Sequence, residues 1–194
     1  DGDYISLWSG KWKTFDDQKQ NANPHSKIET EPMDGKMKIE YKLGSQWQGN
    51  SRMNEPYCGF KLYMNEDENE ENLSECTKIT YRYKGASHDF QVETSEVKDG
   101  DFHSVHINSS DNWTTASIDW NILKQATDWG EDKELKKSEV VKFSWLFKGS
   151  ANSSGILEID DLLCEGMTNS ISTNLTISES DDDSSARFWL NEYK

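Results

Sequence analysis

The stretch from Trp113 to Gly166 decides the fold of this chain. It contains WTTASIDWNILKQATDWGEDK at residues 113–133 and VVKFSWLFKGSANSSGILEIDDLLCEG at residues 140–166. Its strand-like runs are short, rich in β-branched and aromatic residues, and followed by turn residues. Residues 140–147 are nearly all apolar, residues 153–155 predict a turn, and residues 156–163 return as a second strand. We therefore expect a central β-hairpin at 140–163.

A polar loop between Trp120 and Val140 holds the sequence Asp128-Trp129-Gly130. A large aromatic side chain beside a carboxylate in such a loop is unusual to leave in water, and a ligand is the simplest explanation for it. By contrast, Trp113, Trp120 and Trp145 lie within apolar strands, and we expect them in the core.

Short alternating runs also recur before this stretch. Residues 37–43 alternate cleanly, and residues 77–83 place Ile79, Tyr81 and Tyr83 on one face. Further strands are expected at 57–64, 89–93, 102–107 and 113–118, with an edge-like segment at 4–15. The single helical candidate is the short segment 121–126. This pattern predicts an all-β fold, an antiparallel β-sandwich of the jelly-roll type.

The chain has 194 residues and a mass of 22.3 kDa, which is enough for one domain with a proper core. We place a β-sandwich module at 1–166 and a C-terminal extension, rich in Ser, Thr, Asn and Asp, at 167–194. The extension is either a linker to a further module or a terminal strand, in which residues 188–190 would pair along the N-terminal segment.

The formal net charge of -15 argues against nucleic acid and anionic membranes as partners, because both would be repelled. A neutral or cationic partner is favoured. No apolar run approaches the roughly 20 residues that span a bilayer, and no basic and apolar leader begins the chain. We therefore expect a soluble protein without a signal segment.

Three cysteines, Cys58, Cys76 and Cys164, allow one disulfide and one free thiol. A structural Ca²⁺ site is also considered, because hard cations take several carboxylate oxygens. Sandwich folds often bring distant acidic pairs together, and the candidate ligands are Asp16, Asp17, Asp160 and Asp161. The alternative is that these pairs are caps or solvated carboxylates.

No catalytic motif stands out. The Gly-x-Ser-x-Gly sequence of serine hydrolases is absent, and no local motif singles out a pair among the 36 acidic residues. Sugar binding has a stronger physical basis, since pyranose rings stack on aromatic rings and their hydroxyls bind carboxylates and amides. Trp47, Tyr57 and Trp129 each lie near such residues in the sequence, which are Gln46, Gln48, Glu55 and Asp128.

Four segments together resemble one known family: DGKMKIEY at 34–41, EPYCGF at 55–60, DNWTTASIDWNILKQATDW at 111–129 and SGILEIDDLLCEG at 154–166. They resemble the family 11 carbohydrate-binding modules and their family 30 relatives. Those modules are jelly rolls attached to bacterial cellulases, and they bind β-1,4 and mixed-linkage β-1,3-1,4 glucans in a cleft on the concave face.

The resemblance implies sugar-binding roles for specific residues. They are Glu55 with Tyr57, Asp128 with Trp129, Asp99 near a further acidic position, and Trp12 in place of an N-terminal tyrosine. The chain departs from the family at Ala126, Ser144 and Phe147, where the family has arginine, histidine and tyrosine, so the hydrogen bonding to the ligand should differ.

The expectation from sequence is thus a secreted, monomeric, non-catalytic module that binds β-glucan and targets an attached glycoside hydrolase. An extracellular adhesion or structural sandwich with a protein partner is the alternative from another class, and a glycoside hydrolase is a third. Extracellular bacterial origin is implied by the resemblance alone.

Overall fold

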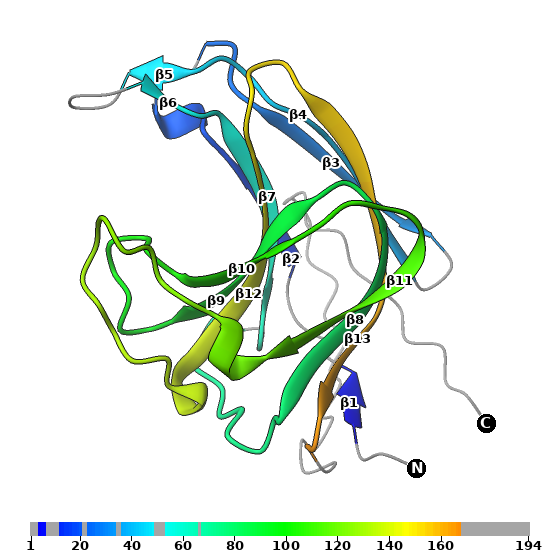
Figure 1. Cartoon of the computed structure of the whole chain (residues 1–194), viewed down its shortest axis with the longest axis vertical. Helices are drawn as coiled ribbons and strands as arrows, with labels where there is room; N and C mark the ends of the chain where they lie inside the picture. The colour runs from blue at the N-terminus through cyan, green and yellow to red at the C-terminus, as the bar shows by residue number, and fades with distance from the viewer. Residues whose placement is uncertain are drawn as a thin grey trace.

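Every strand pairing in the computed structural model is antiparallel, and the strands form two layers (Figure 1). The structure describes residues 4–6, 12–20, 23–33, 36–48, 53–65 and 67–167. The first sheet has the order β11 (Ser110–Asp119), β8 (Lys78–Gly85), β13 (Ser154–Glu165), β4 (Lys36–Lys42) and β3 (Lys27–Met33), and β1 (Tyr4–Ser6) pairs with the end of β13. The predicted antiparallel β-sandwich is confirmed.

The second sheet has five strands in the order β10 (His103–Ile107), β9 (His88–Thr94), β12 (Val140–Lys148), β7 (Tyr57–Tyr63) and β2 (Trp12–Asp16). A small ribbon of β5 (Trp47–Gln48) and β6 (Met53–Asn54) precedes β7. The helical content of the described residues consists of the 3-10 turns η1 (Gln18–Gln20), η2 (Trp120–Ile122) and η3 (Lys137–Glu139). The helix expected at 121–126 is thus reduced to η2. No helix in the described part of the chain is both long and apolar enough to cross a bilayer.

Aromatic rings fill the space between the two sheets. The ring of Trp145 on β12 stacks on Phe60 of β7 at 4.8 Å between centroids, and it meets the ring of Phe90 on β9 edge-on at 5.2 Å. Tyr81, from β8 of the opposite sheet, also contacts Trp145 edge-on at 5.7 Å. All four side chains are fully or almost fully buried. Period-2 alternation in the strands produces this core, because it directs one face of each sheet inward.

The prediction of a β-hairpin at 140–163 is wrong. β12 pairs with β7 and β9, whereas β13 pairs with β4 and β8, so the two strands belong to different sheets. Trp145 of β12 and Leu157 of β13 are both fully buried, which places the strands on opposite sides of the core. The turn after β12 therefore leads the chain from one sheet to the other, and the two apolar strands that it joins do not pair with each other.

Trp113 also departs from the expectation. It is half-buried rather than in the core, and its ring lies 4.9 Å from Lys36 Nζ and 5.3 Å from the Arg82 guanidinium. Trp113 is thus on the solvent side of the first sheet, whereas Trp145 is in the core as expected.

The cysteines behave as the sequence allowed, with one disulfide between Cys76 and Cys164 and one buried free thiol at Cys58. Burial raises the pKa of Cys58 to about 12, so this thiol stays protonated and unreactive near neutral pH. The described sandwich ends at Met167, and the expected terminal strand at 188–190 lies outside the described residues.

Buried His88 should make the stability of the sandwich depend on pH. Burial lowers its pKa to about 4, and its ring fits the neutral form: Nδ1 faces the Ala86 carbonyl at 3.0 Å and Nε2 faces the Tyr81 hydroxyl at 2.7 Å. The unfolded chain, with a histidine pKa of about 6.5, binds more protons between these values, so stability is lost as the pH falls from 6.5 toward 4. We expect a loss of about 2–3 kcal/mol between pH 7 and pH 4.5 from this residue.

Urea unfolding of the wild type and of His88→Gln at the two pH values checks this expectation. The variant should be less stable at pH 7 but should lose less of its stability on acidification. His25→Gln, at a half-buried loop position, serves as the control and should keep the wild-type pH dependence. Equal pH dependence in all three proteins would show that His88 does not carry the effect.

Candidate functional site

The five-stranded sheet presents one face to the core and the other away from it. We call the second the outer face. It comprises Lys13 and Phe15 on β2, Tyr57, Gly59, Lys61 and Tyr63 on β7, Lys142, Ser144, Leu146 and Lys148 on β12, Asp89, Gln91 and Glu93 on β9, and Ser104 and His106 on β10. The set follows from strand alternation, because the intervening residues of β7, β9 and β12 are buried in the core.

An aromatic platform occupies one part of the outer face. The ring of Phe15 lies against Gly59, where an added Cβ would be 2.5 Å from Phe15 Cζ. Tyr57 flanks Phe15 at 6.5 Å between ring centroids, and Lys61 Nζ lies 5.4 Å from the centroid of Phe15. Phe15 and Tyr57 are half-buried, so each keeps part of its surface accessible.

Gly59→Ala is expected to displace Phe15 and destabilise the sheet. The new methyl group would lie 2.5 Å from the Phe15 ring and 2.4 Å from the Trp145 carbonyl oxygen, and the second atom belongs to the backbone. We expect a loss of about 1–3 kcal/mol of unfolding free energy, as is typical of overpacking. Urea denaturation measures the loss. A Gly59→Ala variant as stable as the wild type would contradict the close approach of Phe15.

Charged side chains cover the neighbouring strands. Glu93 on β9 is buried, accepts a hydrogen bond from the Ser144 hydroxyl and forms an ion pair with Lys142 at 2.8 Å. Asp89 contacts His106 Nδ1 at 2.7 Å and Lys148 Nζ at 2.8 Å. Burial by itself raises the pKa of Asp89, but the hydrogen bonds and charges of Lys148 and His106 bring that pKa below its usual value. Asp89 is therefore ionised, and both carboxylates are held in fixed positions by their partners.

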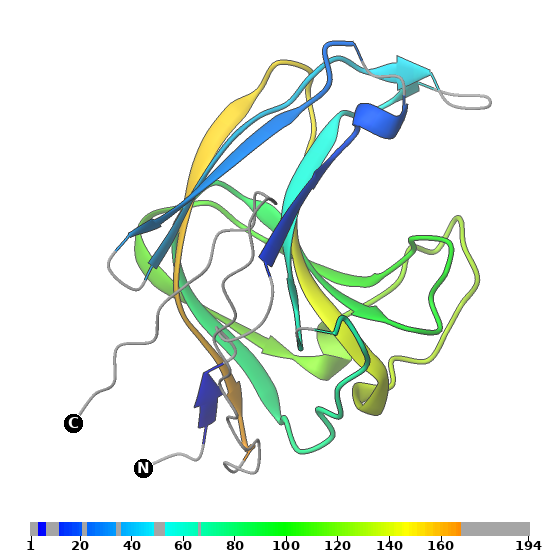
Figure 2. The ribbon, with the colours of Figure 1, turned by 180° about the vertical axis from the view of Figure 1, so that it is seen from behind.

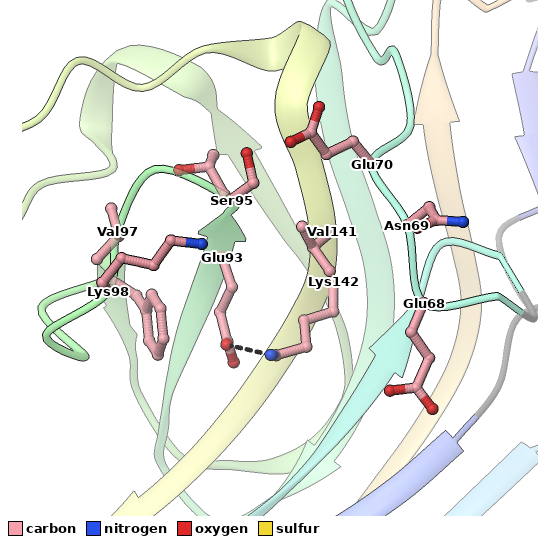
Figure 3. Close-up of a pocket in the computed structure, with 11 residues that line it drawn as sticks. Glu68, Asn69, Glu70, Glu93, Ser95, Val97, Lys98, Val141 and Lys142 are labelled. Carbon is pink, nitrogen blue, oxygen red and sulfur yellow. Dashed lines mark ion pairs between the residues drawn. The ribbon is translucent and has the colours of Figure 1, made fainter.

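A pocket of about 630 Å³ opens where β9 ends and β12 begins (Figure 3). Glu93 and Lys142 line it from the sheet, and their ion pair crosses its floor. The other lining residues come from the loop after β7, the end of β9 and the loop after it, and the start of β12: Glu68, Asn69, Glu70, Thr94, Ser95, Val97, Lys98, Phe102 and Val141. Most of its lining residues are polar or charged, and the pocket continues the outer face.

The loop with Trp129 is held in place by a second loop. Asp99 accepts a hydrogen bond from Asp101 N with one carboxylate oxygen and from Glu131 N with the other, at 3.0 and 2.8 Å. Gly130 has φ +83° and packs against Asp101, where an added Cβ would be 2.7 Å from the Asp101 side chain. The two loops thus hold Trp129 in place while 46% of its surface stays exposed.

The predicted sugar-binding residues form two groups. Asp99, Asp128 and Trp129 lie in the paired loops beyond the end of β9, while Glu55 and Tyr57 lie at the start of β7. Tyr57 pairs with Lys148 and Tyr63 with Lys142, which pairs with Glu93 near the end of β9, so the groups lie toward opposite ends of the sheet, and β7 alone spans about 20 Å from Tyr57 to Tyr63. Trp47, on the β5–β6 ribbon, belongs to the second group, and Figures 1 and 2 show this ribbon and the loops near opposite ends of the five-stranded sheet.

The predicted sugar-binding role of Trp12 must be corrected. It is 5% exposed, and its ring stacks on Phe60 and Trp145 at 5.7 Å in each case. The side chain of Trp12 is part of the core and offers no face to a ligand. Phe15, three residues later, carries the aromatic surface of β2 on the outer face.

The proposed calcium ligands do not converge. Asp17 is buried and accepts hydrogen bonds from Ser26 N at 2.7 Å and from Ser26 Oγ at 2.9 Å, and Ser26 Oγ also accepts from Gly44 N. Asp160 and Asp161 form a bulge in β13 directly after Ile159, which pairs with Met37 at the start of β4. Asp17 lies at the other end of β4, because it is linked through Ser26 to Gly44. The bulge and Asp17 are therefore about 25 Å apart along that strand.

Each acidic pair also has a structural role. Asp161 has φ +49° and its N–H bonds the Asp160 side chain at 2.9 Å, while Asp16 accepts from Gln18 N. Arg82 lies 3.9 and 3.5 Å from the two carboxylates of the bulge. No group of three or more His, Cys, Asp or Glu side chains in the described ranges is arranged to hold a metal. The four aspartates therefore do not fit one Ca²⁺ site.

Sequence reasoning missed the middle of the outer face. Lys61, Glu93 and Lys142 were not identified, because a polar residue at every second strand position is also what ordinary solvent exposure produces. A usable signal was present in β12, where Lys142 and Ser144 interrupt an otherwise apolar run.

The two packed antiparallel sheets define a β-sandwich of the jelly-roll type. A family 11 carbohydrate-binding module from Clostridium thermocellum, in complex with a β-1,3-1,4-mixed-linked tetrasaccharide, superimposes with a TM-score of 0.61 and 15% identity, over 86% of this chain and 96% of that one. A family 30 module of a cellulosomal cellulase from the same organism has a TM-score of 0.54 and 9% identity, over 86% and 98% of the two chains. At these identities the likeness establishes a shared fold, and the resemblance is confirmed at that level.

In sequence, the chain is similar to Endoglucanase 3 of Fibrobacter succinogenes, with 27% identity over 161 residues. The match covers 77% of this chain and 23% of the length of that relative. No protein family model matches the chain.

Proposed function

We propose that this chain is a non-catalytic carbohydrate-binding module whose outer face binds a β-linked glucan chain. The observation that carries the proposal is the distribution of rings on this face. Phe15 and Tyr57 form a platform at one end, the exposed Trp129 stands beyond the other, and hydrogen-bonding side chains lie between them. Pyranose rings stack on aromatic surfaces, and their hydroxyls bind side chains such as Asp89, Gln91 and Lys148.

The carboxylates of this face support binding without catalysis. Asp89 and Glu93 are four residues apart on β9, about 13 Å along the strand, whereas glycosidase pairs are separated by about 5–9.5 Å. Both are also engaged in ion pairs with lysines. The similarity to part of an endoglucanase supports a role in holding an attached glycoside hydrolase near its polymer. The Cys76–Cys164 disulfide supports an oxidising compartment and thus secretion.

Affinity gel electrophoresis tests the proposal. The protein is run through gels containing barley β-glucan, xyloglucan, glucomannan or xylan, and the same samples are assayed for released reducing ends. We expect retardation by at least one β-glucan and no release of sugar. Absence of retardation in every gel would overturn glucan binding and favour the protein-partner alternative, whereas release of reducing ends would show a hydrolase.

A further inference from the structure

Three lysines surround a single aromatic ring where β7 ends on the outer face. The Nζ atoms of Lys13, Lys61 and Lys142 lie 5.2, 5.7 and 5.1 Å from the ring centroid of Tyr63. They come from the adjacent strands β2, β7 and β12, where Lys13 pairs with Lys61 and Lys142 pairs with Tyr63. We call these three lysines with Tyr63 the lysine cluster. It is a concentration of positive charge on a protein whose net charge is -15.

Two of the three ammonium groups are already neutralised. Lys13 forms an ion pair with Glu68 at 2.5 Å, and Lys142 forms one with Glu93 at 2.8 Å. Lys61 has neither a carboxylate within ion-pair distance nor a hydrogen-bond acceptor among the residues that the structure describes. Burial, followed by the charge of Lys142, lowers its pKa, and Lys13 acts in the same direction. Glu93 and Glu68 oppose this shift from a distance, but among the described residues Lys61 forms no ion pair of its own.

The unpaired ammonium group is placed where a bound sugar would meet it. Lys61 Nζ lies 5.4 Å from the centroid of Phe15, which belongs to the aromatic platform. A pyranose stacked on Phe15 would bring its exocyclic group within reach of this nitrogen. A neutral hydroxymethyl group would accept one hydrogen bond from the ammonium group and leave its charge unbalanced, whereas a carboxylate would accept the bond and also balance the charge.

We propose that the outer face recognises a β-linked polysaccharide that carries uronic acid units, and that Lys61 binds the carboxylate. The inference rests on the proposed function and names its substrate class. The acidic net charge does not oppose it strongly, because at 0.15 M ionic strength charges separated by more than about 8 Å are largely screened. Contacts with the lysine cluster are shorter than this.

Isothermal titration with two matched ligands tests the inference. One is cellohexaose, and the other is the hexamer of β-1,4-linked glucuronic acid, which has the same backbone with each C6 as a carboxylate. Each is titrated into the wild type, Lys61→Met and Lys84→Met. Lys84, on β8 of the other sheet, is half-buried and has no ion pair among the described residues, so it is the matched control. The titrations are repeated at 0.05 and 0.5 M NaCl.

We expect the wild type to bind the acidic hexamer at least about tenfold more tightly than the neutral one at low salt, and this preference should shrink at high salt. Lys61→Met should abolish the preference, because the acidic hexamer loses an ion pair whereas cellohexaose loses at most one hydrogen bond, and Lys84→Met should retain the preference. A wild type without the preference, or a preference that survives in Lys61→Met, would overturn this inference and leave glucan binding in place. Binding of neither hexamer, together with no retardation in the glucan gels, would overturn both proposals.

Discussion

Replacing Trp129 by alanine should reduce the affinity for a retarding β-glucan by at least about thirtyfold, which corresponds to the roughly 2 kcal/mol that defines a binding hot spot. The indole is 46% exposed on a loop that Asp99, Asp101 and Gly130 hold in place, so its truncation removes a rigid stacking surface and leaves the loop intact. Affinity electrophoresis over a range of polysaccharide concentrations measures the change.

Trp113→Ala is the matched control for this prediction. Trp113 is also a partly exposed tryptophan, but it lies on the first sheet between Lys36 and Arg82, away from the outer face. The control variant should bind as the wild type does. Equal losses in the two variants, or an unchanged affinity in Trp129→Ala, would remove Trp129 from the site.

Loss of the Cys76–Cys164 disulfide should lower the unfolding free energy by about 4–5 kcal/mol, because the bond closes a long loop in the unfolded chain. The two cysteines are 88 residues apart in sequence, and the bond joins the segment before β8 to the end of β13. A Cys76→Ser, Cys164→Ser double variant, unfolded in urea, measures the effect.

Reduction of the wild type with dithiothreitol should reproduce the loss, and the same treatment should leave the double variant unchanged. Cys58→Ala retains the disulfide and should keep its response to the reductant. A wild type whose unfolding midpoint is the same with and without reductant would contradict the stabilising role of the bond.

Local patterns predicted the existence of most strands, because alternation needs only neighbouring residues. The runs at 57–64 and 89–93 correspond to β7 and β9 within two residues at either end. β3 was missed, since KIETEPM carries three charges and a proline, which is the composition of an edge strand. Partners of a strand depend on the whole sheet, and for this reason the hairpin at 140–163 was wrong.

The candidate site was only partly predictable for a related reason. Trp129 was identifiable because a tryptophan in a polar loop contradicts ordinary burial. The role of Asp99 could not be inferred, since its two backbone partners include Glu131, 32 residues away. The role of Lys61 could not be predicted, because only the register of β2 and β7 shows that Lys13 lies beside it.

The pairing of β1 with the end of β13 has a consequence for a longer polypeptide. Tyr4 pairs with Glu165 and Ser6 with Leu163, so the first and last described strands enter and leave the body side by side. Both belong to the sheet that does not carry the outer face. A domain fused at either end would be attached through the same small region, on the sheet opposite the face proposed to bind the polymer.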